Sequence, residues 1–273
     1  MMKRLSILIS TICAVVLFSF HAQATKTFIT VASTTSTANS GLFEYLLPKF
    51  SEETGIEVRV VAVGTGQAVR LARKGDADVL FVHHRPSEEK FVADGFGDKR
   101  YDVMYNDFVI IGPKNDPAQI KNCMSPTSAL RKIKNSGQAF ASRGDDSGTN
   151  KRELSLWKMA GLEDKDLRGE WYRATGSGMG ATLNIAAGMN AYTLSDRGTW
   201  IAFKNKQNLD VLCEGDQRLF NPYGVIAVSK KRFPHVKNAE ATTFVNWLIS
   251  AKGQKLIGDF RVKDQPLFTP NAK

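Results

Sequence analysis

The stretch SRGDDSGTN, at residues 142–150, combines an arginine, an acidic pair and several small hydrogen-bonding side chains. A guanidinium group is a rigid fork of N–H donors that fits an oxyanion in a bidentate way. Ser147, Gly148 and Thr149 follow Arg143 by four to six residues and add hydroxyl and backbone N–H donors. A set of donors suits a ligand that offers only acceptors. The stretch therefore indicates an anion site in which Arg143 supplies the charge.

Two earlier stretches follow the same order of a strand, small polar or glycine residues, and a helix start. They are ASTTSTANSG (32–41) and VGTGQAV (63–69). A helix start leaves backbone N–H groups unpaired and carries the positive end of the helix dipole, so an anion is stabilised there. The plain alternative is that these residues cap their own helices and that the glycines only allow turns.

Each arginine of interest also has a structural alternative. Arg143 can pair with Asp145 or Asp146, and such a pair could also hold the guanidinium in place for a ligand. Arg197, in YTLSDRGTW (192–200), is either a second cation for the anion or part of an ion pair in a surface turn.

Enzyme and metal motifs are absent from the sequence. It contains no G-x-S-x-G, H-E-x-x-H or P-loop motif, and its histidines and cysteines lack metal-ligand spacing. Ser155 and Lys158 match S-x-x-K, but they lie within a predicted helix and have no K-T-G companion. The sequence thus predicts no catalytic residue, no protein-bound metal and no cofactor.

The elements that must position these loops follow an α/β order. Residues 27–33, 56–64 and 77–82 are predicted strands, and helices are predicted at 41–55 and 67–75. Alternating strands and helices are typical of a parallel sheet with right-handed crossovers.

A second α/β series follows in the later part of the chain. Its predicted strands are 138–144 and 170–175, and its helices lie near 150–160 and 180–190. Two similar extended stretches, 103–113 and 219–230, flank this series, which indicates that the chain crosses to a second lobe and returns. Helices at 238–250 and 251–260 end the chain. We expect lobe I at 25–114 and 216–273, lobe II at 115–215, and a ligand cleft between them.

The N-terminus predicts export. Lys3 and Arg4 precede an apolar run from Leu5 to Phe20 and an A-x-A site, so residues 1–24 are expected to form a signal peptide cleaved near Ala24. Its loss lowers the net charge from +10 to +8, which fits an anionic partner but does not identify one. The basic residues are scattered, so no nucleic-acid partner is expected. In an exported chain, Cys123 and Cys213 are candidates for a disulfide, with two buried thiols as the alternative.

Taken in order, four motifs carry a resemblance to a known family. STTS (33–36), GTG (64–66), SRGDDSGTN and YTLSDRGTW are similar to motifs of the tungstate-binding periplasmic component of tungstate ABC transporters. The resemblance covers nearly the whole mature chain. It implies a bilobal type II periplasmic binding fold, usually monomeric, that holds a tetrahedral oxyanion between its lobes and delivers it to a permease of the inner membrane. By position, it implies this ligand shell: Thr35, Ser36, Thr65, Gly66, Arg143, Ser147, Gly148, Thr149 and Arg197.

Two departures and one alternative remain beside the resemblance. Ser33 stands where the family commonly has threonine, and Asn150 stands where it often has histidine. Phosphate-binding relatives share an acid at the position of Asp145, so phosphate is the alternative to tungstate or molybdate. An Asp145 that faces the ligand would favour protonated phosphate, and an Asp145 turned onto Arg143 or its own helix would favour tungstate. An exported hydrolase or transferase acting on a phosphorylated substrate is a further alternative, which requires a nucleophile beside a base.

Overall fold

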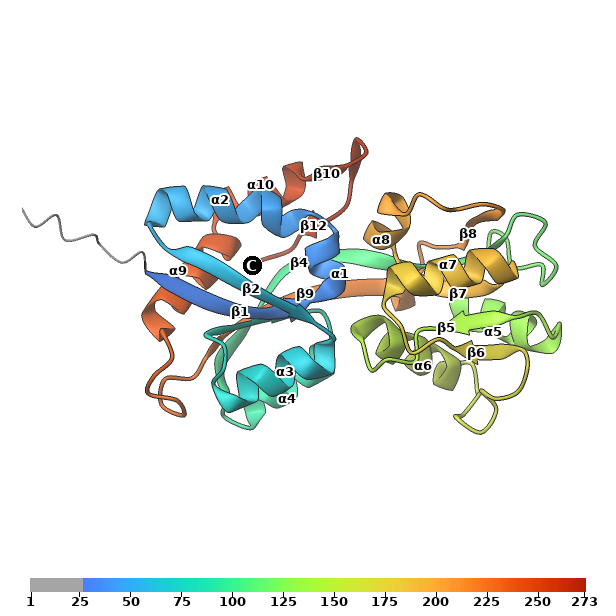
Figure 1. The fold of residues 1–273 in the computed structure, drawn as a ribbon, viewed down its shortest axis with the longest axis horizontal. Helices are drawn as coiled ribbons and strands as arrows, with labels where there is room; N and C mark the ends of the chain where they lie inside the picture. Colours follow the sequence, from blue (N-terminus) through green and yellow to red (C-terminus); the bar gives the residue numbers. More distant parts are fainter. Residues whose placement is uncertain (1–26) are drawn as a thin grey trace, which may run out of the picture.

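The computed structural model describes residues 27–273, which form two α/β lobes joined by long strands (Figure 1). The expected signal peptide, residues 1–24, lies outside the described residues. In the first lobe, β1 (Phe28–Thr34) pairs in parallel with β2 (Glu57–Val63) on one side and β3 (Val79–Val82) on the other. The predicted parallel arrangement of these three strands is therefore confirmed.

Helices follow each of these strands in turn. Of them, α1 lies in a stretch expected to be a loop, and α4 was not expected from the sequence either. Its segment RPSEEKFVA is mostly polar and buries only Glu88 and Phe91, so it carries little apolar periodicity. Instead its start is defined by the His84 side chain, which accepts from the Ser87 N–H, and by Pro86 in the first turn. The four helices are α1 (Thr35–Asn39), α2 (Leu42–Thr54), α3 (Thr65–Lys74) and α4 (Arg85–Ala93).

Two antiparallel strands connect the lobes. The longer, β4 (Gly97–Pro113), pairs with β9 (Phe220–Val228) as far as Asp107 and then with β7 (Tyr192–Asp196) from Phe108 onward. One strand thus belongs to the sheets of both lobes, and β9 lies between β3 and β4 in the first. The pairing partner of β4 changes at residues 107–108. The lobe limits expected near residues 114 and 216 stay a prediction.

The second lobe is built on the sheet order β4-β7-β5-β6, with β8 paired to the end of β4. Strands β7 and β8 were not expected, because both are short and β7 follows directly on an apolar helix. Besides β7, this lobe contains α5 (Pro126–Asn135), β5 (Phe140–Ser142), α6 (Gly148–Met159), β6 (Tyr172–Ala174), α7 (Met179–Met189), α8 (Arg197–Ala202), β8 (Leu209–Cys213) and η1 (Gln217–Leu219).

The chain returns to the first lobe for its last part, where α9 (Asn238–Ile249) and α10 (Ala251–Asp259) pack (Figure 1). The end of the chain adds the pair β10 (Arg261–Val262) and β11 (Gln265–Pro266), and β12 (Thr269–Pro270), which pairs with β4. Both C-terminal helices were predicted, and both fill the first-lobe core with apolar side chains.

Each lobe has its own aromatic core. Phe50 and Phe244 lie edge to face at 5.0 Å between ring centroids in the first lobe, and Phe140 and Trp157 at 5.1 Å in the second. The two lobes therefore have separate hydrophobic cores and are joined by the connecting strands.

Cys123 and Cys213 form a disulfide within the second lobe, with Cα atoms 5.2 Å apart. It ties the loop before α5 to the end of β8. Among residues 27–273, no helix is long and apolar enough to cross a membrane.

Candidate functional site

A polar cleft of about 260 Å³ lies where the two lobes face each other. Its walls are the helix-entry loops at the carboxyl ends of β1, β2, β5 and β6, where α/β folds place ligands. The first lobe contributes Thr35, Gly64, Gly66, Gln67 and Arg70, and the second contributes Arg143, Asp145, Asp146 and Gly178.

Three buried polar atoms at this interface have no hydrogen-bond partner among the described residues. They are Thr65 Oγ1, Thr149 Oγ1 and Arg143 Nε, on side chains that are 0%, 0% and 3% exposed. An unsatisfied buried polar group costs about 1–3 kcal/mol, so such groups normally have a partner. All three can donate a hydrogen bond, which indicates that a ligand rich in acceptors completes the site.

Two helix starts add unpaired backbone donors to the cleft. The N-cap residues of α3 and α7, Gly64 and Gly178, line the cleft and have no side chain to cap the helix. The first N–H groups of both helices are therefore left to another partner, and both helix dipoles are positive at this end.

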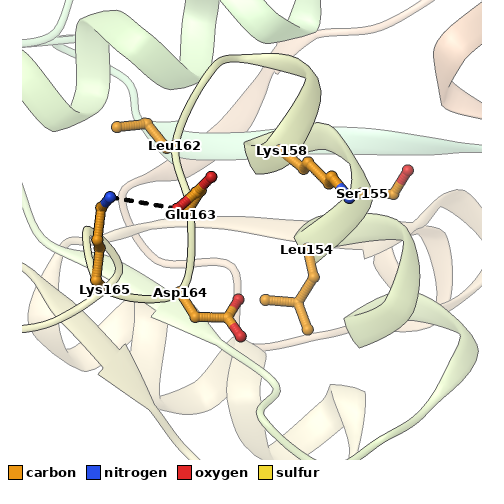
Figure 2. Close-up of a pocket in the computed structure, with 7 residues that line it drawn as sticks. All are labelled: Leu154, Ser155, Lys158, Leu162, Glu163, Asp164 and Lys165. Atoms are coloured by element: carbon orange, nitrogen blue, oxygen red, sulfur yellow. Dashed lines mark ion pairs between the residues drawn. The ribbon is translucent and has the colours of Figure 1, made fainter.

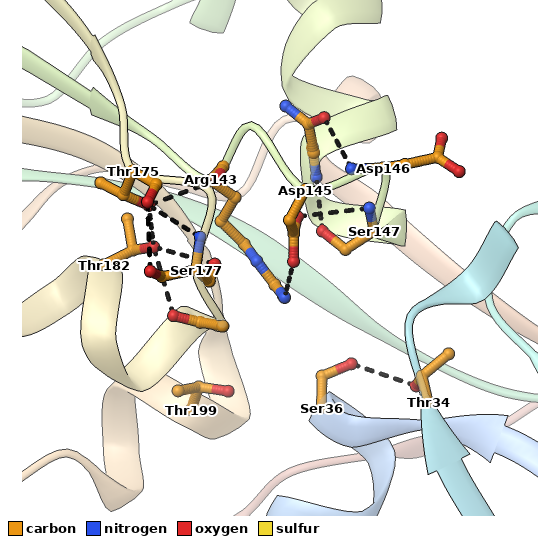
Figure 3. A network of polar contacts seen from close by, with 12 residues as sticks. Thr34, Ser36, Arg143, Asp145, Asp146, Ser147, Thr175, Ser177, Thr182 and Thr199 are labelled. Carbon is orange, nitrogen blue, oxygen red and sulfur yellow. Dashed lines mark hydrogen bonds and ion pairs between the residues drawn. The ribbon is translucent and has the colours of Figure 1, made fainter. Parts of the chain in front are cut away.

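Asp145 is turned onto its own loop (Figure 3), whereas the Asp146 carboxylate lies against Gly66 of the first lobe. Asp145 accepts from Arg143 Nη2 with one carboxylate oxygen and from the Ser147 N–H, at 3.3 Å, with the other. Asp146 pairs with Lys151. The Arg143 side chain is thereby held in place by Asp145, while its Nε–H stays available.

Asn150 stabilises the same loop from within α6. Its backbone N–H donates to Ser147 Oγ at 3.1 Å, and its side-chain oxygen accepts from the Asp146 N–H at 3.2 Å. Ser147 thus caps α6 through its oxygen, and its hydroxyl hydrogen remains a donor.

A buried carboxylate lies beneath Arg143. Glu153 of α6 accepts from Tyr172 OH at 2.6 Å, from Ser142 Oγ at 2.8 Å and from Trp157 Nε1 at 3.2 Å. Burial raises the pKa of Glu153 to about 7, against the opposing effect of these hydrogen bonds. The network ties α6 to the end of β5, immediately before Arg143.

The lobes touch through two glycines at helix starts. A Cβ atom on Gly148 would lie 2.6 Å from His83 Cε1 and 3.0 Å from Thr65 Oγ1. A Cβ atom on Gly66 would lie 2.2 Å from Asp146 Oδ2. These contacts bring the starts of α3 and α6 together across the cleft, and with them Thr65, Gly66 and Gly148 of the expected ligand shell.

Thr34 and Ser36, from the first-lobe stretch ASTTSTANSG, lie apart from Arg143 and its hydrogen-bond partners (Figure 3). Thr34 caps α1 by accepting from the Thr37 N–H, and Thr35 lines the cleft. The Ser36 hydroxyl lies 3.1 Å from His83 Nε2 and 3.1 Å from Thr34 Oγ1.

Arg197 is placed differently from the other expected ligands. Its guanidinium donates twice to Asp107, both at 2.6 Å, and also to Glu214 at 2.6 Å. The hydrogen bonds with Asp107 raise its pKa, against the effect of burial. Its ion pairs fasten α8 to β4 near the point where that strand changes lobes. Of the expected ligand shell, only Thr35, Gly66 and Arg143 line the cleft directly, and the residues that do not are Ser36, Thr65, Ser147, Gly148, Thr149 and Arg197.

Sequence reasoning missed three side chains at this interface: Gln67, Arg70 and His83. The signal for Arg70 was present, because it follows Gly66 by four residues on a predicted helix and so lies on the same face. Its Nη1 lies 3.4 Å from where a Gly66 Cβ would be. The sequence placed His83 at the end of a predicted strand, near the surface or cleft, and favoured a solvated loop histidine. That expectation is wrong, because His83 is only 5% exposed and the sheet order brings it to the interface.

The S-x-x-K match has no catalytic surroundings. Ser155 and Lys158 are exposed on α6, where they border a surface groove with Leu162 and the Glu163–Lys165 ion pair (Figure 2). A serine nucleophile requires an adjacent general base, and none is hydrogen-bonded to Ser155 in the described structure. Residues 27–273 also contain no group of three or more His, Cys, Asp or Glu side chains arranged to hold a metal ion.

The chain is similar to proteins of a known family. The model of the family described as PBP superfamily domain matches residues 21–252. The tungstate-binding protein TupA of Peptoclostridium acidaminophilum is 48% identical, covering 90% of this chain and 87% of its own. Among solved structures, the tungstate-binding protein TupA of Desulfovibrio alaskensis G20 has 46% identity and a TM-score of 0.81, covering 90% of this chain and 100% of its own. A tungstate ABC transporter structure from Geobacter sulfurreducens has 50% identity and a TM-score of 0.78, covering 85% and 98%.

Proposed function

Since the chain belongs to the PBP superfamily and, within it, to the tungstate-binding proteins, we propose that it captures tungstate between its lobes and delivers it to an ABC transporter permease. The type II periplasmic binding fold, with two α/β lobes and two connecting strands, fits this role. Relatives at 42–48% identity carry the name of tungstate-binding proteins.

The three unpartnered buried donors carry this proposal. Thr65 comes from the first lobe, and Arg143 and Thr149 come from the SRGDDSGTN stretch of the second, yet each leaves a donor unsatisfied. Tungstate is a tetrahedral dianion that offers only acceptors, so one ligand could satisfy all three. The uncapped starts of α3 and α7 would stabilise its charge further.

The proposed ligand shell follows from the position of each side chain. Arg143 supplies the inner charge, and Arg70, on the exposed side of the cleft, supplies a second charge at its mouth. Arg197 is left out as a direct ligand, because two carboxylates already occupy its guanidinium. The remaining donors of the shell are Thr35, Ser36, Thr65, Gly66, Ser147, Gly148 and Thr149.

Asp145 supports tungstate over phosphate. A site for protonated phosphate benefits from a carboxylate that accepts the ligand's hydrogen. Both Asp145 oxygens already accept hydrogen bonds from its own loop. Asp145 is thus turned onto its own loop, the arrangement expected with tungstate or molybdate, while Asp146 places Oδ2 against Gly66 at the cleft.

The setting of the protein belongs to the same proposal. The signal peptide expected at residues 1–24 would export the chain to the periplasm, where a permease of the inner membrane would receive the anion. The chain would act as a monomer that binds and releases its ligand without chemical change, with no cofactor.

Thermal unfolding in the presence of different oxyanions tests the proposal. Purified mature protein is heated with tungstate, molybdate, sulfate or phosphate. A ligand at ~100 times its dissociation constant adds about 2.7 kcal/mol to the free energy of unfolding, which raises the melting temperature measurably. We expect a shift with tungstate and with molybdate. A shift with phosphate alone would show that the tungstate assignment is wrong.

Arg143→Ala tests the charge at the centre of the site. Loss of a hydrogen bond to a charged group costs about 1.5–3 kcal/mol, so tungstate should bind roughly 10- to 150-fold more weakly by calorimetry. Arg173→Ala is the matched control, because Arg173 is exposed on β6. Equal affinities of the two variants would remove Arg143 from the ligand shell.

A further inference from the structure

His83 lies where the two lobes meet, although it is not part of the ligand shell proposed above. It directly follows β3, its side chain is 5% exposed, and its ring stacks on Tyr223 with 4.9 Å between centroids. Gly148, the first residue of α6, packs against the ring from the other lobe. The imidazole therefore links the sheet of one lobe to the anion-binding helix start of the other.

The hydrogen bonds around His83 define which ring nitrogen carries the hydrogen. Asn221 donates through Nδ2 to Asn106 Oδ1 at 2.7 Å and to the Tyr223 hydroxyl at 3.3 Å. Its side-chain oxygen is thereby turned toward His83 Nδ1, at 2.9 Å. An amide oxygen only accepts, so Nδ1 must carry the hydrogen and a neutral ring has its lone pair on Nε2.

That lone pair determines the direction of the Ser36 hydroxyl. Ser36 Oγ lies 3.1 Å from Nε2, and in a neutral ring Nε2 can only accept. The Ser36 hydrogen therefore points at His83 and is engaged there. The side chain of a residue of the proposed ligand shell thus donates to a histidine.

The charges around the ring keep it neutral without a ligand. Burial lowers the pKa of His83 to about 4, against the effect of the Asn221 hydrogen bond, and Arg143, His84 and Arg152 lower it further. The carboxylates around these groups have other partners. Asp145 pairs with Arg143, Asp146 with Lys151 and Glu88 with Arg100, and the buried Asp196 accepts from the Thr199 N–H and hydroxyl. A bound dianion would add negative charge on the side from which Arg143 acts.

We propose that His83 is a positioning residue of the anion site, which takes up a proton at Nε2 when the dianion binds and so turns the Ser36 hydroxyl to the ligand. The proton comes from solvent and forms an N–H bond at Nε2. This N–H donates to Ser36 Oγ, which frees the Ser36 hydrogen to donate to an oxygen of the anion. The inference rests on the proposed function, because it requires a dianion beside Ser36.

Calorimetry in several buffers tests this proposal. Tungstate is titrated into the mature protein at pH 7 in buffers that differ in ionisation enthalpy. The measured binding enthalpy is plotted against the ionisation enthalpy of the buffer, and the slope gives the number of protons exchanged. We expect an uptake of about one proton per tungstate bound, because binding and protonation are linked.

Two substitutions at His83 separate its roles. In His83→Gln, the amide can turn either its oxygen or its NH₂ group toward Ser36, so tungstate should bind without proton uptake. In His83→Asn, the side chain can keep a bond to Asn221 but is too short for Ser36, so uptake is lost and binding weakens roughly tenfold, the worth of one hydrogen bond. His235→Gln, at an exposed histidine, should keep the wild-type uptake.

The outcomes distinguish this inference from the proposed function. Tungstate binding without proton uptake in the wild type, or uptake that persists in His83→Gln, would overturn the inference and leave the function intact. Absence of tungstate binding in the wild type would overturn the proposed function and the inference with it.

Discussion

Thr149 illustrates how a single buried hydroxyl can point to a ligand. It is fully buried at the start of α6, and its Oγ1 has no partner among the described residues. Serine and threonine at helix starts usually cap the helix, but here Ser147 performs that task. The Thr149 hydroxyl is thus not needed to cap the helix and is available to an anion.

Thr149→Val should separate stability from binding. Valine has the same shape and lacks the unsatisfied donor. The free energy of unfolding without ligand should therefore stay unchanged or rise, and the rise should not exceed about 3 kcal/mol. Tungstate affinity should fall roughly tenfold or more, since a hydrogen bond to a charged ligand is lost. Urea unfolding and calorimetry measure the two effects.

Thr243→Val is the control for that change, because Thr243 is exposed on α9. It should leave affinity at the wild-type value. A Thr149→Val protein that binds tungstate as tightly as the wild type would place the hydroxyl outside the site.

The neutral state of His83 predicts a loss of stability in acid. Folding lowers its pKa from 6.5 to about 4, mainly through burial, so the unfolded chain binds more protons between these two values. The stabilisation is present above pH 6.5 and is lost as the pH falls toward 4, by about 3 kcal/mol in total. The unfolding free energy of the wild type, relative to that of His83→Gln, should therefore fall by roughly 2.5 kcal/mol between pH 7.5 and pH 4.5. A constant difference would mean that the ring is not held neutral.

Site residues could be predicted where they are close together in the sequence, but not where the sheet order brings them together. Arg143 and the donors that follow it in the chain stood together in one loop, so their types and spacing were visible. His83 comes next to Ser36 only because β3 pairs with β1. Arg197 looked equivalent to Arg143 in the sequence, and only its carboxylate partners on β4 and after β8 distinguish the two.

At the level of elements, the site depends on how closely the starts of α3 and α6 approach. Gly148 permits that approach, because any side chain there would meet the buried His83 ring. Gly180 provides a comparison within the first turn of α7, where a Cβ atom would have nothing within 4 Å.

Gly148→Ala should weaken tungstate binding while the protein stays folded. The added methyl group would push α6 from His83 and Thr65, and we expect at least a tenfold loss of affinity, which corresponds to about 1.4 kcal/mol. Gly180→Ala should bind normally and gain up to about 1 kcal/mol in stability, because alanine is the better helix former. Calorimetry and thermal unfolding of both variants give the comparison. Normal binding by Gly148→Ala would contradict the close approach of the two helix starts.

Most elements were predictable because they carry strong periodic patterns. The parallel strands β1, β2 and β3 and the helices α2, α9 and α10 appear close to where the sequence placed them. Among the missed elements are the helices α1, α4 and α8 and the strands β7 and β8, since α4 is mostly polar and the others are only five or six residues each. Short or polar elements are formed by tertiary packing, which a local pattern does not contain.

At the scale of the whole molecule, the two lobes meet around a set of donors that neither lobe could assemble alone. The sequence indicated two crossings from the similar stretches 103–113 and 219–230. It could not show that β4 continues as one strand through both sheets, because only the change of pairing partner at 107–108 marks the passage. The ligand cleft follows from this arrangement, since the helix starts of both lobes converge beside the connecting strands.

Crystals of the protein grown with tungstate would locate the anion through the anomalous scattering of tungsten. We expect one strong anomalous peak in the cleft, with tungstate oxygens within hydrogen-bond distance of Arg143 Nε, Thr65 Oγ1 and Thr149 Oγ1. We expect no contact between the anion and Arg197. A peak elsewhere on the molecule, or a cleft without tungsten while these three donors remain unpartnered, would contradict the proposed function.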